Sequence, residues 1–193
     1  MKRITREWLK KLGVPGVLIP GLMLAAALGW KTNDLYQTQN FYENQAIFPK
    51  SAVVESVIDG DNLVLENGQS VRLIGINAPE RGKENFEVAK GKLDSLATGR
   101  KVYLEYDRYQ DDKFGRVLAW IWIGCENEPQ FFPADYMHLN KRQSRSGLTE
   151  NPDGCKEGKL VNELMVDSGL AKVETYQDRG ELKYEERIRN YDR

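Results

Sequence analysis

Histidine and cysteine are scarce in this chain, which has one histidine, His138, and two cysteines, Cys125 and Cys155. The cysteines are too far apart for a Cys-x-x-Cys pair that binds metal or exchanges disulfides. His138 has only Asp135 close by in the sequence, a poor ligand set for zinc, so we predict that it is a surface residue. In an oxidising compartment the two cysteines would form one disulfide, and in a reducing one they would remain thiols.

The chain also lacks an excess of positive charge. It has 28 basic and 29 acidic residues, for a formal net charge of -1. Basic residues gather within the first eleven positions, so the remainder is acidic. A protein that coats nucleic acid without regard to sequence uses a broad positive field, which is missing here. Any contact with nucleic acid must come from a few placed cations.

A long uncharged run occurs at residues 12–30. As a helix of about 1.5 Å per residue it would be roughly 28 Å long, just enough to cross a bilayer. Its prolines, Pro15 and Pro20, disfavour a buried helix of a soluble core but are tolerated in membranes. The basic residues before the run predict a transmembrane helix with the N-terminus inside and the rest extracytoplasmic. The alternative is a signal peptide cleaved near the alanines at 25–27, after which the protein is secreted.

The length of 193 residues suits one domain with an appendage. We predict a basic flank with anchor or signal at 1–30, a tether at 31–50 and a folded domain at 51–193. Within that domain, β-branched and apolar runs bounded by turn residues predict five short strands: 53–58, 63–65, 71–76, 102–106 and 116–123.

Helical spacing of apolar residues appears in two places. Residues 84–97 repeat apolar side chains at this spacing before Gly99, and Val161, Leu164, Met165 and Ser168 share one face of a second helix. The charged stretch 181–190 predicts a third helix. A mainly β, α+β fold with a helix between the third and fourth strands is typical of a five-stranded OB-fold barrel.

Residues 124–157 read as an insertion that contains both cysteines. Long loops without structure of their own are uncommon unless they are functional or tied down. A disulfide between Cys125 and Cys155 would close this one at its base and contribute on the order of 3–4 kcal/mol.

Three short segments place carboxylates and arginines at strand ends: 57–61, 72–80 and 112–116. Hydrolysis of a phosphodiester needs neutralised phosphate oxygens, a polarising cation and a base for water. Arginine suits the first task because its planar fork binds two phosphate oxygens and stays protonated. Each segment alone is typical of an ordinary turn or loop, and the order of all three is what indicates function.

That order resembles the staphylococcal nuclease (thermonuclease) family. The resemblance extends from residue 51 to about 191, interrupted by the insertion, and includes the segments 160–164 and 168–173. It implies that Asp61 is a Ca²⁺ ligand, that the Ala78 carbonyl is another, and that Asp59 supports the site. Asn77 stands where the family usually has aspartate, which keeps an oxygen ligand but removes a charge, so Ca²⁺ binding should weaken. Asn62 stands where the family usually has threonine.

For the phosphate, the same resemblance implies that Arg72 and Arg116 are the binding arginines and that Glu80 is the general base. Lys113 would touch a substrate phosphate. Tyr176 is the nearest tyrosine for stacking a base, and packing on the last helix is an equal alternative.

We therefore predict a membrane-anchored or secreted Ca²⁺-dependent nuclease that cleaves DNA and RNA with little sequence preference. One alternative is a catalytically weakened module that binds nucleic acid or protein on the same fold. Another is an interaction role for the insertion, with the barrel as scaffold.

Overall fold

The computed structural model describes residues 11–12, 18–20, 23, 48–132, 149–175 and 180–192. The chain forms two compact units, Met1–Phe48 and Pro49–Arg193. Most of the first unit lies outside the described residues, including most of the expected anchor and the tether up to residue 47. None of the helices in the described ranges has the length and apolar character needed to cross a membrane.

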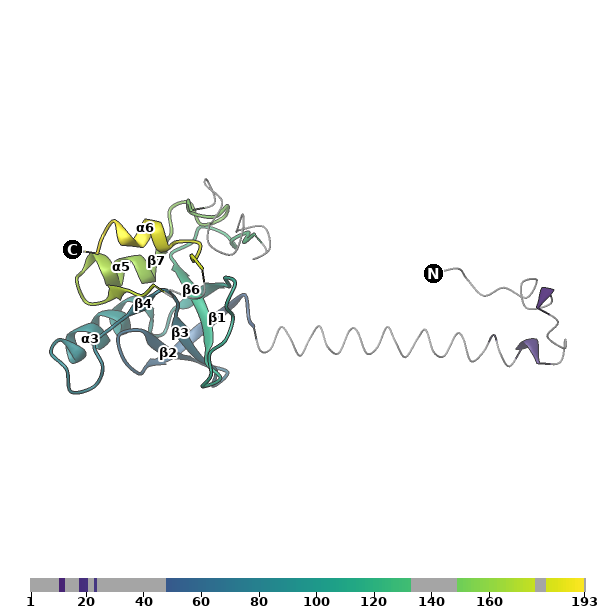
Figure 1. The fold of residues 1–193 in the computed structure, drawn as a ribbon, viewed down its shortest axis with the longest axis horizontal. Helices are drawn as coiled ribbons and strands as arrows, with labels where there is room; N and C mark the ends of the chain where they lie inside the picture. The colour runs from purple at the N-terminus through teal and green to yellow at the C-terminus, as the bar shows by residue number, and fades with distance from the viewer. Residues whose placement is uncertain are drawn as a thin grey trace. The chain divides into compact units, whose positions relative to one another are not determined.

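The second unit contains a closed barrel (Figure 1). Its strands are β1 (Ser51–Val57), β2 (Asn62–Leu65), β3 (Ser70–Leu73), β5 (Lys101–Glu105) and β6 (Val117–Ile123). They lie in the order β3-β2-β1-β5-β6, and a parallel pairing of β3 with β6 closes the ring. All residues of β6 are buried, including Trp120 and Trp122. The predicted five-stranded barrel is confirmed.

The third strand is shorter than predicted. The apolar run 71–76 divides into β3 and the two-residue strand β4 (Ile76–Asn77). Gly75 separates them with a φ of 76°, in the left-handed region that glycine tolerates best. The side chains on both sides of the break are buried, so the hydrophobic pattern gave no sign of it. β4 then pairs with β8 (Lys172–Val173), close to the C-terminus.

Three helices accompany the barrel within the described ranges of the second unit: α3 (Phe86–Ala97), α5 (Val161–Asp167) and α6 (Glu185–Arg189). α3 contacts β1, whereas α5 contacts β6 and α6. A short strand, β7 (Lys159–Leu160), leads into α5. α3 begins two residues later than predicted because Asn85 adopts a left-handed conformation with φ 64°.

The last helix is also shorter than predicted, because residues 181–184 are held by the barrel. The Lys183 backbone N–H donates to the Asp107 carboxylate at 2.7 Å. The buried Lys183 Nζ and Tyr184 hydroxyl donate to Glu105 at 2.5 and 2.9 Å. Trp122 Nε1 donates to the same carboxylate at 2.9 Å. Buried charges need such partners, and this network fixes the C-terminal segment on β5.

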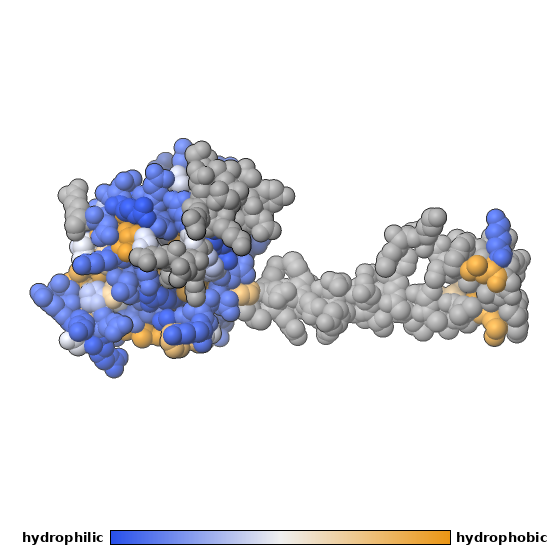
Figure 2. Space-filling model, in the orientation of Figure 1, coloured by the Kyte–Doolittle hydropathy of each residue, from blue (hydrophilic) through white to orange (hydrophobic). Residues whose placement is uncertain are grey.

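At the base of the insertion, Cys125 and Cys155 form a disulfide across a sequence separation of 30. A backbone hydrogen bond from Asn127 N to Gly154 O, 2.9 Å long, joins the same two stretches. His138, predicted to lie on the surface, is outside the described residues. The face of the second unit turned to the viewer in Figure 2 is mostly hydrophilic.

Candidate active site

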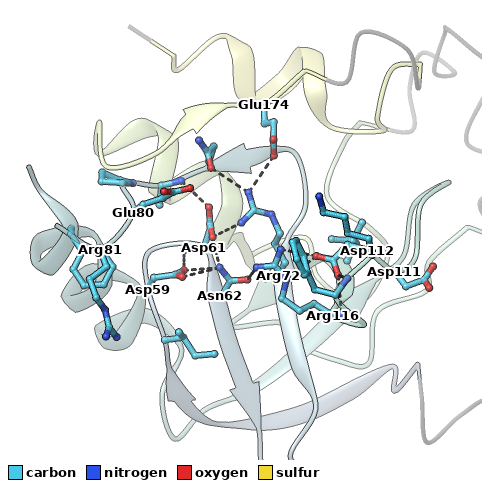
Figure 3. A pocket seen from close by; sticks show the side chains of 18 residues that line it. Asp59, Asp61, Asn62, Arg72, Glu80, Arg81, Asp111, Asp112, Arg116 and Glu174 are labelled. Carbon is cyan, nitrogen blue, oxygen red and sulfur yellow. Dashed lines mark hydrogen bonds and ion pairs between the residues drawn. The ribbon is translucent and has the colours of Figure 1, made fainter. Parts of the chain in front are cut away.

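An open pocket of about 900 Å³ lies at the ends of β2 and β3, between the β1–β2 turn, β4 and the loop before β6. In Figure 3, Asp61, Asn62 and Arg72 point toward one another, whereas Arg81 and Asp111 point away from the centre of the pocket. The pocket brings together eight of the predicted site residues: Asp59, Asp61, Arg72, Asn77, Ala78, Glu80, Lys113 and Arg116. The three segments that are separate in sequence therefore share one cavity.

Asp61 is the buried carboxylate of the pocket, with 3% of its surface exposed. Oδ1 accepts hydrogen bonds from Arg72 NH1 at 2.7 Å and Asn62 Nδ2 at 2.6 Å. Oδ2 accepts from the Ala78 backbone N–H at 2.8 Å. Burial raises the pKa of the Asp61 carboxyl to about 7, although the nearby Arg72 and Ala78 N–H favour the charged form.

Asn62 connects the acidic side of the pocket with Arg116. Its Nδ2 donates to both oxygens of Asp59, at 2.8 and 3.0 Å, as well as to Asp61. Its Oδ1 accepts from Arg116 NH1 at 2.8 Å. The start of β2 places Asn62 between these groups, and its buried amide is satisfied at both ends.

Arg72 lies on β3 next to Asp61. Besides the ion pair with Asp61, its NH2 has three acceptors at 3.3 Å: Ile76 O, Asn77 Oδ1 and Glu174 Oε2. Glu174 reaches the pocket because the pairing of β8 with β4 extends to a hydrogen bond from Glu174 N to Gly75 O, 2.9 Å long. Arg72 thus links β3 to the segment that follows β8.

Arg116 is held by Asp112 in a side-on pair. Nε and NH2 contact Asp112 Oδ2 at 2.7 and 2.6 Å. Asp112 Oδ1 accepts from the backbone N–H groups of Phe114 and Arg116 at 2.9 and 3.0 Å. Burial acts against ionisation of Asp112, but the hydrogen bonds from Arg116 and Phe114 outweigh it and lower the pKa of this carboxyl. The Asp112 carboxylate is thus held by backbone N–H groups, and it in turn orients the Arg116 guanidinium.

Glu80, Lys113 and Phe114 are exposed at the pocket. Among the described residues, the Glu80 carboxylate has no hydrogen bond or ion pair. The Lys113 ammonium and the Arg116 guanidinium lie 5.0 and 5.3 Å from the centre of the Phe114 ring. A carboxylate that faces the cavity without a partner can accept a proton, and the two cations add positive charge to the same pocket.

The oxygen atoms around Asp61 fit a hard cation. The Asp61 carboxylate, the Asn77 amide oxygen and the Ala78 carbonyl are ligand types that Ca²⁺ accepts. Over the described ranges, no group of three or more histidine, cysteine, aspartate or glutamate side chains converges in a way that would hold a metal ion. A cation at Asp61 would therefore depend on neutral oxygens and on oxygens brought by a substrate.

Several residues that shape the pocket were not assigned a role from the sequence. Asp112 could have been found, because it stands four residues before Arg116 in the same loop. Glu174 gave no local signal, since it approaches Arg72 from 102 residues away. Tyr176, considered for base stacking, lies outside the described residues.

Comparison with known proteins points to one family. The model of the staphylococcal nuclease homologue family matches residues 70–193. Thermonuclease of Staphylococcus intermedius is 44% identical over 86 residues, which cover 40% of this chain and 51% of that protein. Thermonuclease of Staphylococcus hyicus is 32% identical over 141 residues, 68% of this chain and 63% of that protein. An uncharacterized endonuclease of Escherichia coli is 30% identical over 97 residues, 49% of this chain and 56% of that protein.

The matches span about half to just under two thirds of these relatives' own lengths. The family match covers β3 to α6, which includes Arg72, Glu80, Arg116 and the C-terminal segment that carries Glu174. The chain belongs to the staphylococcal nuclease family.

Proposed function

We propose that this protein is a Ca²⁺-dependent nuclease that hydrolyses phosphodiester bonds in DNA and RNA with little sequence preference. The observation that carries the proposal is the convergence of Arg72, Arg116, Asp61 and Glu80 on one open pocket. These groups supply two guanidinium forks that suit phosphate, a buried carboxyl ligand and an unengaged base. Membership of the nuclease family supports the same reading.

The two arginines would bind the phosphate oxygens of the scissile group. Arg116 is oriented by Asp112 and Asn62, and Arg72 by Asp61. Because both guanidinium groups are held before substrate binds, little reorganisation is needed as charge develops on the phosphoryl oxygens. Their rigid, permanently charged forks suit this task better than lysine would.

Asp61, Asn77 and the Ala78 carbonyl would hold the cation. When bound, Ca²⁺ would polarise a phosphate oxygen and make a nearby water more acidic. The Asn77 amide contributes no negative charge, so the ligand set is weaker than one with two carboxylates. We expect the protein to need more Ca²⁺ than a relative with aspartate at this position.

Glu80 would act as the general base. It directly follows Ala78 and Pro79 at the end of β4, so it stands beside the proposed cation ligands. Its carboxylate has no competing partner among the described residues and can take a proton from water within the pocket. General bases typically contribute about 10²–10⁴-fold to a rate.

A cleavage assay on the full chain tests this proposal. Single-stranded DNA and RNA are incubated with Ca²⁺ titrated against a chelator, using the wild type, Glu80→Gln and Glu84→Gln. Glu84 is also exposed but does not line the pocket, so it is a matched control. We expect Ca²⁺-dependent cleavage that Glu80→Gln lowers by about 10²–10⁴-fold and Glu84→Gln leaves unchanged.

Full activity of Glu80→Gln would refute its role as the base. A folded wild type that cleaves nothing at any Ca²⁺ concentration would favour the second candidate, a binding module on the same fold. The neutral Asn77 is the observation that favours this alternative, because it removes one charge from the cation site.

We further propose that the nuclease domain lies outside the membrane, anchored by residues 12–30 or secreted after their removal. A disulfide is typical of oxidising compartments, and the Cys125–Cys155 pair supports this location. Digestion of intact cells with added protease, followed by N-terminal sequencing of the mature protein, tests it. Protection of the domain in intact cells would refute the proposal.

A further inference from the structure

An exposed phenylalanine lines the candidate active-site pocket. Phe114 belongs to the lining of this pocket, yet 71% of its surface is exposed. A single exposed apolar side chain needs no explanation by itself. Phe114 differs from such a residue in two respects: hydrogen bonds hold its backbone in a tight turn, and two cations lie beside its ring.

The turn that carries Phe114 is closed on both sides by hydrogen bonds. The Gly115 N–H donates to the Asp112 carbonyl, and the Asp112 N–H donates to the Arg116 carbonyl, each at 3.1 Å. The Asp112 carboxylate accepts from the Phe114 N–H itself at 2.9 Å. Asp112 and Arg116, on either side of this turn, are joined side by side in Figure 3. The backbone of Phe114 is therefore held in place before any ligand binds.

The two cations beside the ring are Lys113 and Arg116. The Lys113 ammonium lies 5.0 Å and the Arg116 guanidinium 5.3 Å from the centre of the Phe114 ring, within the range of cation–π contacts. Arg116 is the residue proposed above to bind a phosphate. Because one sugar joins each base of a strand to its phosphate, a phosphate at Arg116 brings a neighbouring base close to Phe114.

The chemistry of phenylalanine limits what it can do with that base. Its side chain has no hydroxyl or other polar atom, so it cannot hydrogen-bond a phosphate or the edge of a base. What it offers is the face of an aromatic ring, on which a nucleobase can stack. Aromatic side chains combined with cations that follow the phosphates are the usual means of binding unpaired nucleic-acid strands.

We propose that Phe114 stacks on a nucleobase of the substrate, next to the phosphate that Arg116 holds. The inference rests on the proposed nuclease function. Every base has an aromatic face, so stacking on Phe114 adds affinity without selecting a sequence. Phe114 and Arg116 together then grip one nucleotide by its base and by its phosphate, which positions the strand in the pocket.

The test measures binding separately from cleavage. A fluorescent thymidine hexanucleotide, or an abasic strand with the same label and the same phosphates, is titrated with the full chain in chelator. The dissociation constant is read from anisotropy. Phe114→Leu keeps an apolar side chain but removes the aromatic face, and Phe114→Trp restores an aromatic face. Phe132→Leu is the matched control, because Phe132 is 51% exposed but does not line the pocket.

We expect Phe114→Leu to weaken binding of the thymidine strand by at least about fivefold, the lower limit for one stacked base, and to leave the abasic strand unchanged. Phe114→Trp should bind the thymidine strand at least as tightly as the wild type, and Phe132→Leu should change neither constant. Equal weakening for both strands would overturn the inference and make Phe114 a residue that acts only through Arg116.

Unchanged binding in Phe114→Leu would also overturn the inference, as would a wild type that binds the two strands equally or binds neither. Failure of the proposed nuclease function has a separate signature. Absence of cleavage by the wild type with Ca²⁺ would refute that activity, whereas the difference between the two strands would still decide the role of Phe114.

Discussion

Asn62 has a single amide orientation that satisfies all its neighbours. Its nitrogen faces the carboxylates of Asp59 and Asp61, and its oxygen faces Arg116. Threonine, the usual residue of the family here, has one hydroxyl and cannot supply an amide donor and a separate carbonyl acceptor. In this protein the carboxylates of Asp59 and Asp61 are therefore joined to Arg116 by one side chain.

At Asn77, restoring a carboxylate should strengthen cation binding. We predict that Asn77→Asp raises the affinity for Ca²⁺ by at least about fivefold, the factor that corresponds to roughly 1 kcal/mol of added attraction. Calorimetric titration of the full chain with Ca²⁺ measures this directly, without reference to activity. An unchanged dissociation constant would show that the cation is not bound beside residue 77.

The contribution of Asp112 to the free energy of unfolding should depend on pH. The folded state lowers the pKa of this carboxyl, so its pairing with Arg116 stabilises the protein fully above the ordinary value of 3.8. That contribution disappears as the pH falls through the lower folded pKa. We predict that Asp112→Asn lowers the free energy of unfolding by roughly 1 kcal/mol at pH 7 and by less at pH 3, measured by urea denaturation. An equal loss at both pH values would contradict the assignment.

At the scale of elements, the break between β3 and β4 determines which residues reach the pocket. Gly75 turns the chain so that Asn77 and Glu80 reach the pocket, and it receives the hydrogen bond that fixes Glu174. A Cβ on Gly75 would lie 2.7 Å from Trp120 Cη2, inside the barrel. The turn therefore requires glycine for two reasons, its left-handed backbone and the lack of space for a Cβ.

We predict that Gly75→Ala lowers the free energy of unfolding by about 2–4 kcal/mol, since it adds a left-handed backbone cost to overpacking. Gly68→Ala is the matched control: it has a similar φ of 81° but no atom within 4 Å of the added Cβ. Urea denaturation of both variants separates the two costs. Equal losses would mean that contact with Trp120 contributes nothing.

Regular elements were largely predictable from the sequence. The strands and the helix at 86–97 follow apolar patterns that burial confirms, because the period of a pattern depends only on local geometry. The break at Gly75 was missed because buried residues continue on both sides of it. The helix expected at 181–190 was too long because Asp107 and Glu105 hold residues 183 and 184 from a distant strand.

The site was predictable where its residues fall in the three segments 57–61, 72–80 and 112–116, whose order along the chain resembles the family. Asp61, Arg72, Glu80 and Arg116 are such residues. These positions line one pocket, and their roles remain predictions that the assays above address. The contact between Arg72 and Glu174 was beyond the sequence, because it depends on the pairing of β4 with β8. Tertiary pairing of this kind leaves no local pattern.

At the scale of the whole molecule, the disulfide closes a long loop. By the chain-entropy model, a closure of this length is worth about 3–4 kcal/mol. We predict that reduction lowers the free energy of unfolding of the full chain by that amount, measured by urea denaturation with and without dithiothreitol. The double variant Cys125→Ser/Cys155→Ser should be insensitive to the reductant. A reductant effect in the double variant would show that the loss has another cause.

The parallel pairing of β3 with β6 has a consequence for the time course of folding. It places Arg72 opposite Leu118 and so brings the two arginines, 44 positions apart in the sequence, to one rim. Chains dominated by such distant pairings fold slowly. The β1–β2–β3 meander can form without this contact, but Arg72 and Arg116 meet at the pocket only once β3 has paired with β6. A chain in which β3 and β6 are still unpaired therefore holds its arginines apart, and we expect any nuclease activity to return only after that pairing has formed.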